Sequence, residues 1–473
     1  MRPISLCAKV PKQRIILRRD SSFSCHLFLI EILMKNTQYL LVKYPILNRV
    51  LNHCLAIGML LLVCSQGRAD EVISVAPSAQ PLHWSDAIRQ TLANNPALIA
   101  SGYQLSAQAG RVQQAGIKTN PEISLSVEDA LGSGDFAGMD RAETNLGISW
   151  VLNGGQRQQR VATAQARTGV LEVAQDIQRL DAAATTARLY ITVLALQTRL
   201  QQTQQAIDIA RDAVKVIDSR VTAGNLPSAE VARAKVDLSR RQLEQDDIEH
   251  EIAIARRQLA AQWGETDSTF TEARGDIFNP PAPSTISELK FRLQNNPRLA
   301  QFMTTERWEQ SQLALAKAES KPQWKASIGL KHIAASDDQA LMAGVSVPIA
   351  LFDKQQGRIA EARANIELTR AEREAERVRL DAAVFAVHQE LLHNLHLIKA
   401  YRNTILPQLE LAMKETRRAY DLGRYSYVEW QSVQRELLDA KNTLIDASVA
   451  AHMKAIEIER LTGVAITPHA QIN

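Results

Sequence analysis

Tyr420-Asp-Leu-Gly-Arg-Tyr-Ser-Tyr-Val-Glu429 is a glycine turn between two long stretches of helical sequence. It has a twin at Val221-Thr-Ala-Gly-Asn-Leu-Pro-Ser-Ala-Glu230, 199 positions earlier, in which Gly224 and Glu230 match Gly423 and Glu429. A turn at the end of a long helix favours a residue that tolerates positive φ, and glycine does so without steric strain. We therefore expect each stretch to be the tip of a long helical hairpin.

The residues after each glycine predict that a second helix begins there. Ser426, followed three residues later by Glu429, has the spacing of a capping box. In the twin, Pro227 replaces Ser426 and is suited to the first turn of a helix.

The two tips belong to a duplication that covers most of the chain. Asn94-Asn95-Pro96 recurs as Asn295-Asn296-Pro297, and Gly264 recurs as Gly463. Two copies of one unit predict internal pseudo-symmetry. The predicted organisation is a leader at 1–69, a polar segment at 70–81, the first copy at 82–264, a linker at 265–284, the second copy at 285–463 and a tail at 464–473.

Residues 1–69 differ in composition from the rest. They hold all four cysteines, and their ten basic residues outnumber two acidic ones, so the formal charge of +4 becomes −4 without them. The basic balance therefore gives no reason to expect a nucleic-acid partner. The short apolar run 55–63 predicts a secretory signal peptide cleaved after Ala69, with Met34 as the expected start of translation. Lipidation of Cys64 is a minority alternative, because the bulky Val63 precedes it.

Apolar and polar residues alternate in two places, which predicts strands with one face exposed to water. Two β-hairpins are expected, at about 121–150 and 323–348. They could pack on a soluble core or contribute to a transmembrane barrel. Four strands cannot close a barrel, but three chains would supply twelve. Trp150 and Trp324 at strand ends would suit an interfacial aromatic girdle.

Each predicted hairpin of strands is followed by very long helices, at 155–222 and 227–263 in the first copy and at 356–422 and 426–461 in the second. The first of them lacks proline, and its apolar residues keep a 4–3 coiled-coil spacing from Leu189 to Val221. Such a helix would be roughly 100 Å long, too long for a compact core. We expect Pro407 to kink the third helix.

Four aromatic residues lie at the second tip: Tyr420, Tyr425, Tyr427 and Trp430. A tip so far from the strands should have few partners within its own chain. We therefore expect these side chains to contact another subunit or another protein.

No pattern for catalysis or a cofactor stands out. The sequence has no phosphate-binding loop, nucleophile elbow or dinucleotide fingerprint. The densest histidine group is His388, His393 and His396, with His452 on the following helix. His388 and His393 are five residues apart, which turns their rings to different helix faces. We expect packed or solvated histidines rather than a metal site, no cofactor, and a protein that is not an enzyme.

The duplication, the order of elements in each half and the pattern Tyr420-x-x-Gly423-x-x-Ser426-Tyr427-x-Glu429 resemble the TolC-like outer membrane factors, the exit ducts of tripartite efflux and secretion systems. The segment 406–412 is most similar to the CzcC-like heavy-metal branch. The implied fold is mainly α with a small β part. Its long antiparallel coiled-coil hairpins would form an α-barrel, and its four strands would join a trimeric 12-strand outer-membrane β-barrel.

The resemblance also implies a function. The chain would be a homotrimeric, passive duct for heavy-metal cations in the outer membrane of a Gram-negative bacterium, in contact with lipid and with a large periplasmic portion. Its tips would dock on a periplasmic adaptor bound to an inner-membrane pump of the resistance-nodulation-division type. A duct for drugs and other solutes and a type I secretion duct are alternatives within the family. A soluble periplasmic coiled-coil adaptor is an alternative from another class.

Carried onto this chain, the family pattern implies two sets of site residues at the tips. The docking and gating set is Gly224, Asn225, Leu226, Glu230, Gly423, Arg424, Tyr425, Ser426, Tyr427 and Glu429. A second set could form charge pairs that hold the tunnel mouth closed: Asp218, Arg220, Arg417, Arg418 and Asp421.

Overall fold

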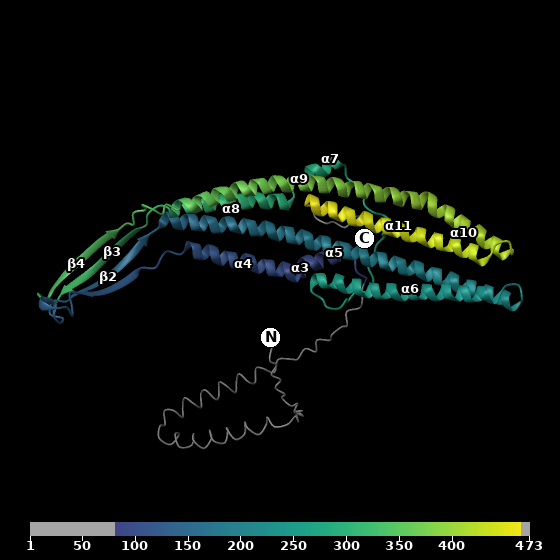
Figure 1. The fold of residues 1–473 in the computed structure, drawn as a ribbon, viewed down its shortest axis with the longest axis horizontal. Coiled ribbons are helices and arrows are strands. Elements are labelled where there is room, and N and C mark those ends of the chain that lie inside the picture. The colour runs from purple at the N-terminus through teal and green to yellow at the C-terminus, as the bar shows by residue number, and fades with distance from the viewer. Residues whose placement is uncertain (1–80, 465–473) are drawn as a thin grey trace, which may run out of the picture. The chain divides into compact units, whose positions relative to one another are not determined.

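The helices and strands follow the duplication that the sequence predicts (Figure 1). The computed structural model describes residues 81–464, which all lie in one structural unit of the chain, 77–473. The first copy comprises α3 (Trp84–Asn94), α4 (Pro96–Gly116), β1 (Glu122–Glu128), β2 (Glu143–Leu152), α5 (Gly154–Thr222) and α6 (Ser228–Ala260). The second comprises α7 (Ile286–Leu293), α8 (Pro297–Glu319), β3 (Trp324–Ile333), β4 (Asp338–Ser346), α9 (Gln356–Ala400), α10 (Leu406–Asp421) and α11 (Tyr427–Thr462).

Some expectations fall outside the described residues. The predicted leader with Met34 and Cys64, nearly all of the polar segment before residue 82 and nearly all of the tail after residue 463 are among them. Of the helices within 81–464, none is both long enough and apolar enough to cross a membrane.

The four strands form one antiparallel sheet in the order β1-β2-β3-β4. Its centre joins the two copies, because β2 pairs with β3 along ten residues, from Glu143 opposite Ile333 to Leu152 opposite Trp324. Strands β1 and β4 are therefore the two edges. Within the described unit, the sheet lies at one end and the two helical turns lie at the other (Figure 1).

The long helices pack as the coiled-coil spacing predicts. Helix α5 runs beside α6, α4 and α8 and also contacts α11 of the second copy. Its stripe from Leu189 to Val221 is buried or half-buried at every predicted position. Each copy has its own apolar core, around Trp84 and Tyr190 in the first and around Leu289 and Val384 in the second.

The repeated Asn-Pro motifs and the repeated glycines meet in the folded chain. Asn95 caps α4 and donates a hydrogen bond from Nδ2 to the carbonyl of Gln262 at 2.8 Å. Asn296 caps α8 and donates in the same way to the carbonyl of Leu461. Each motif thus fixes the start of one helix to the end of the hairpin of its own copy.

Both glycines at these joints need their conformation, and Gly463 also needs its small size. Gly264 and Gly463 have φ of +85° and +70°, which strains most other residues. A Cβ at Gly463 would lie 2.6 Å from Cδ of Pro297. In both copies the glycine thus lies beside the proline of the Asn-Pro motif, and in the second copy no larger residue would fit.

The helix is disturbed near Pro407 but is not broken there. A π-helical turn at Tyr401–Ile405 joins α9 to α10, and Pro407 lies in the first turn of α10. A π turn shifts the register of a helix, which lets the chain accommodate a residue without an N–H. At the end of the first hairpin, α6 stops at Ala260 and a 3₁₀ turn completes the stretch predicted to run to residue 263.

The linker between the copies contacts both of them. Its first part packs on the first copy, where the Arg274 N–H donates to the carbonyl of Leu82 at 3.0 Å, and its second part packs on the second copy. Nε2 of His452 donates to the carbonyl of Ile277 at 3.1 Å, and Nε2 of His388 donates to that of Ser284 at 3.0 Å. Arg402 donates to the carbonyl of Phe278 at 2.6 Å. Two of the four clustered histidines thus have a structural role.

Candidate functional site

The tips of the two hairpins lie against one another. An aromatic cluster of Tyr420, Tyr427 and Trp430 packs on small and apolar residues of the first hairpin, Ala213, Ile217 and Ala234. The Tyr420 and Trp430 rings are stacked with centroids 5.1 Å apart, and the Tyr427 ring meets both edge-on. We call these six residues the tip cluster.

The expectation that the tip aromatics have few partners within the chain is therefore wrong for Tyr420, Tyr427 and Trp430. Trp430 is fully buried, as are Tyr420 and Tyr427 to within a few per cent. The first hairpin has two small residues at this contact, Ala213 and Ala234. They leave room for the aromatic rings of the second hairpin, so the tips pack together. Among the four aromatic residues, Tyr425 alone is exposed, at 48%.

Burial also sets the ionisation of the two phenols. It raises the pKa of Tyr427 to about 12 and raises the pKa of Tyr420 as well, although the nearby arginines partly oppose the second shift. Both phenols are therefore neutral at physiological pH, and the charges at the tip come from other side chains.

Arg220 connects the first hairpin to the second. Its guanidinium lies 4.5 Å from the centre of the Tyr420 ring and donates to the carbonyls of Tyr420 and Asp421 at 3.1 and 3.2 Å. It also pairs with the Asp421 carboxylate at 3.7 Å. Arg417 lies 4.4 Å over the Trp430 ring and pairs with the same carboxylate at 3.4 Å.

Three of the five predicted charge-pair residues thus lie together: Arg220, Arg417 and Asp421. The other two, Asp218 and Arg418, are exposed and form no ion pair within residues 81–464. A cation–π contact is worth about 0.5–2 kcal/mol and a partly exposed ion pair up to about 1 kcal/mol. The Arg220 contacts are thus strong enough to favour one arrangement of the hairpins but weak enough to be broken.

The turns themselves have the predicted geometry. Gly224 and Gly423 have φ of +78° and +72°. The capping box is confirmed, because the Ser426 N–H donates to Oε2 of Glu429 at 2.7 Å and the Glu429 N–H donates to Oγ of Ser426 at 3.3 Å. The hydrogen bond from the Ser426 backbone, with that from its hydroxyl, lowers the pKa of Glu429. Pro227 directly precedes α6, in the position of Ser426 and not within the first turn.

The predicted docking residues differ in accessibility. Leu226 and Glu230 are half-buried, and Tyr427 is buried, so its side chain does not belong to the surface. Leu422 and Val428 of the second turn are exposed apolar residues that the family pattern did not single out. The exposed members of the predicted set are Gly224, Asn225, Gly423, Arg424, Tyr425, Ser426 and Glu429.

At the opposite end of the unit, the sheet has one apolar face that is open to solvent. Side chains alternate between the faces of a strand, so the register of the four strands assigns each residue to a face. Trp150 and Trp324 lie on the apolar face near the helical end of the sheet. Its other large members are Ile123, Leu125, Val127, Leu146, Ile148, Leu152, Ile328, Leu330, Leu341 and Val345.

The other face of the sheet is polar and charged. Lys325 pairs with Glu122 at 2.6 Å, and Lys331 pairs with Glu143. Serines and glycines occupy much of the space between these pairs. One sheet thus presents a wide apolar face and a polar face with charges of both signs.

The four histidines of α9 and α11 have different surroundings. His393 and His396 are exposed on α9, whereas His388 and His452 contact the linker. In the part of the chain that the structure describes, no three His, Cys, Asp or Glu side chains are grouped so that they could hold a metal ion.

This arrangement, two long hairpins with paired tips and a sheet with one exposed apolar face, is that of an outer membrane channel. The sequence pattern of the outer membrane efflux protein family matches residues 87–265 and 290–464, once in each copy. The chain belongs to this family. The resemblance inferred from the tips and the duplication is confirmed, and the family decides against the soluble adaptor.

Two relatives carry names that refer to metal resistance. The chain is 24% identical to the cobalt-zinc-cadmium resistance protein CzcC of Cupriavidus metallidurans over 414 residues, which cover 86% of this chain and 98% of that protein. It is 21% identical to the nickel-cobalt-cadmium resistance protein NccC of Alcaligenes xylosoxydans over 332 residues, 68% of this chain and 73% of that protein.

Solved structures confirm the fold. The outer membrane protein VceC of Vibrio cholerae superposes with a TM-score of 0.65 at 18% identity, over 81% of this chain and 97% of that one. The outer-membrane channel OprN gives a TM-score of 0.67 at 17% identity, over 81% and 91%.

Proposed function

We propose that this chain is the outer-membrane exit duct of a tripartite system that exports heavy-metal cations. The observation that supports this most directly is the similarity to a cobalt-zinc-cadmium resistance protein along 98% of that protein's length. A second metal-resistance relative matches over a shorter region. The family pattern matches both copies, and thus both tips and all four strands.

Three copies would form the duct. In each chain, β1 and β4 are edge strands whose outer N–H and C=O groups need partners. Pairing β4 of one copy with β1 of the next in a ring of three would give twelve strands, enough to close a barrel. The apolar face of the sheet would then contact lipid, and the polar face with Glu122 and Lys325 would line the lumen.

The tips would form the periplasmic entrance and dock on an adaptor, which would connect the duct to a resistance-nodulation-division pump. The pump would supply the energy, and the duct would carry out no bond chemistry. Opening would move one hairpin against the other and would break the contacts of Arg220 with Tyr420 and Asp421. A duct passes ions well when no site along it binds them tightly.

Growth of a deletion strain and of the same strain complemented with this chain tests the proposal. Plates carry graded zinc, cadmium, cobalt or copper, or one of a panel of drugs. We expect the deletion to cause sensitivity to metals alone and the chain to restore growth. A matched control is the chain with Leu125→Asp and Leu341→Asp, which should not restore growth because the lipid-facing surface becomes charged.

Other results would contradict the metal assignment. Sensitivity to drugs alone would assign the duct to general solute efflux. No growth defect, together with loss of a secreted protein, would assign it to type I secretion.

A further inference from the structure

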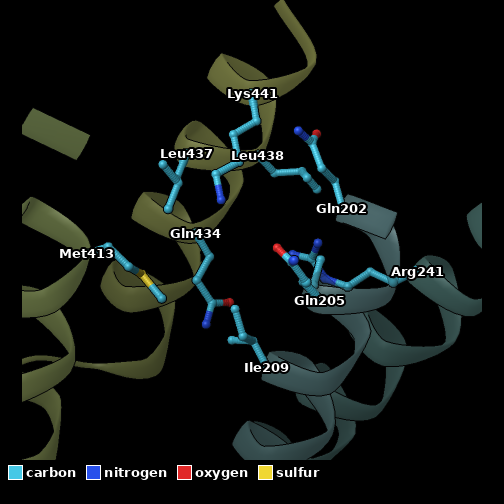
Figure 2. A pocket seen from close by; sticks show the side chains of 10 residues that line it. Gln202, Gln205, Ile209, Arg241, Met413, Gln434, Leu437, Leu438 and Lys441 are labelled. Atoms are coloured by element: carbon cyan, nitrogen blue, oxygen red, sulfur yellow. The ribbon is translucent and has the colours of Figure 1, made fainter. Parts of the chain in front are cut away.

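A pocket lies between the two hairpins, with walls from α5 and α6 of the first copy and α10 and α11 of the second (Figure 2). The cavity volume is about 60 Å³, which is room for a few water molecules, and the pocket is partly open to solvent. The predicted site residues at the tips do not line this pocket.

Two cations face this pocket from opposite hairpins. Arg241 on α6 is only 6% exposed, and its guanidinium lies beside Gln205 in the pocket wall (Figure 2). Lys441 extends into the pocket from α11 (Figure 2). Asp237 accepts a hydrogen bond from Nε of Arg241 at 3.0 Å, whereas Lys441 forms no ion pair within residues 81–464. Asp237 thus offsets the charge of Arg241, and the charge of Lys441 is left without a carboxylate partner among the described residues.

Two amides in the pocket are also incompletely bonded. Gln434 is 7% exposed and reaches from α11 toward Ile209, and its Nε2 has no hydrogen-bond partner among residues 81–464 (Figure 2). Oε1 of Gln202 on α5 is also buried, and it too has no partner in that part of the chain. A buried polar group without a partner costs about 1–3 kcal/mol. A ligand with an oxygen atom for Gln434 would remove that cost.

The rest of the wall is apolar. Ile209 of the first hairpin and Met413, Leu437 and Leu438 of the second line the pocket between its polar groups. An inorganic anion would leave these side chains uncovered, whereas an organic acid would cover them with its apolar part.

We propose that this pocket binds a small organic monoanion, a carboxylate with a short apolar body. Its carboxylate lies between Arg241 and Lys441 and accepts a hydrogen bond from Nε2 of Gln434. Its apolar part packs on Met413 and Leu437. Because the walls belong to different hairpins, the ligand favours the state in which the hairpins are together. Binding does not depend on which solute the duct exports.

Ligand-observed fluorine NMR on the full-length protein in detergent tests the site with 4-fluorobenzoate as the probe. The neutral isostere 4-fluorobenzamide is the control for charge. We expect the benzoate to bind and to raise the thermal unfolding temperature by mass action, and the benzamide to do neither. Lys441→Gln and Gln434→Leu should each weaken benzoate binding about tenfold or more.

Arg240→Gln is the matched control, because Arg240 is exposed next to Arg241 and does not line the pocket. It should bind the probe like the wild type. Arg241→Gln removes the partner of the nearly buried Asp237, so Lys441→Gln, whose folding is checked by circular dichroism, is the deciding variant.

Three results would overturn the proposal. The first is equal binding of benzoate and benzamide, which would indicate apolar adsorption. The second is undiminished benzoate binding by Lys441→Gln. The third is no binding of benzoate at about 10 mM, a concentration that would detect even weak sites and would show that the pocket holds water alone.

Discussion

At the scale of single residues, Arg220 differs from the other charged groups near the tips because its contacts cross from one hairpin to the other. Its guanidinium reaches a ring, two carbonyls and a carboxylate of the second hairpin. Arg417, by contrast, contacts only the second hairpin, to which it belongs. Removing Arg220 should therefore loosen the two tips from one another without unfolding either.

We predict that Arg220→Gln weakens the contact between the tips by about 1–2 kcal/mol, the sum expected for a cation–π contact and a partly exposed ion pair. Hydrogen exchange of the backbone at 413–430 in the full-length protein measures this as faster exchange. Arg418→Gln is the control, because Arg418 is exposed and forms no ion pair with the other described residues. Equal exchange in the two variants would show that Arg220 does not hold the tips together.

Glu459 on α11 gives a prediction for pH. Burial raises the pKa of Glu459 to about 7, despite the opposing effect of Arg292. The folded protein therefore keeps a proton that the unfolded chain releases near its ordinary value of 4.5. This contribution to stability is complete below about pH 4.5 and is lost as the pH rises through about 7, by at most about 3 kcal/mol.

Glu459→Gln carries no charge at any pH, so its unfolding temperature relative to the wild type should increase between pH 5 and pH 8. Thermal unfolding of both proteins at the two pH values measures the difference. The exposed Glu436→Gln on the same helix is the control. A difference that does not change with pH, or that changes as much for Glu436→Gln, would contradict the assignment.

At the scale of elements, the tip cluster joins the hairpins more firmly than the charges do. Trp430 is fully buried among residues of both hairpins. Replacing a buried tryptophan with alanine removes a large apolar area and leaves a cavity, which typically costs about 3–5 kcal/mol. The contact between the hairpins should not survive that loss, whereas the cores near α3 and α7 should.

We predict that Trp430→Ala makes the turns at 222–228 and 421–427 sensitive to limited proteolysis while the protein remains folded elsewhere. Tyr103→Ala, which removes an exposed aromatic side chain from α4, should leave the cleavage pattern unchanged. Uniform cleavage along the whole chain would instead show that Trp430 stabilises the entire fold.

The elements were predictable where a short-range pattern specifies them. The 4–3 spacing of α5 and the alternation in β1 to β4 each repeat within a few residues, and Asn95-Pro96 and Gly423 mark ends by local conformation. The fit of Trp430 against Ala213 and Ala234 was not predictable, because it depends on which hairpin faces which. The π turn at 401–405 was missed for a related reason, since a proline predicts a disturbance but not its form.

In the candidate site, too, local features could be predicted from the sequence, whereas features that depend on the packing of the two hairpins could not. Gly224, Gly423 and the Ser426–Glu429 capping box could be predicted because each acts within its own turn. Tyr427 was assigned to the surface wrongly, since the tip pattern says nothing of burial. The pocket between the hairpins was missed entirely, because Gln202, Arg241 and Gln434 are single polar residues on helices where polar residues are common.

At the scale of the whole molecule, the exposed side chains of the tips are what a partner would meet. Tyr425 is the exposed aromatic residue of the second turn, next to Arg424 and Leu422. Large aromatic side chains and arginine contribute most often to binding energy at interfaces. They are therefore the side chains on which docking of an adaptor should depend.

We predict that Tyr425→Asp reduces cross-linking of the tips to the adaptor about tenfold or more, the loss expected for an interfacial aromatic residue. The variant should still assemble as the wild type does, because Tyr425 does not belong to the tip cluster. Asp218→Asn, a change of an exposed residue on the first hairpin, is the control. Unchanged cross-linking of Tyr425→Asp would remove this residue from the docking surface.

The order β1-β2-β3-β4 also has a genetic consequence. Its two edges, β1 and β4, come from different copies of the duplicated unit, so in the proposed ring of three a chain would join its neighbours head to tail and would not complete the barrel alone. A variant that pairs normally through its strands but cannot open at its tips would enter mixed rings with wild-type chains. When both are expressed together, most rings would contain at least one defective member. Loss of tip function should therefore be dominant, whereas loss of strand pairing should be recessive.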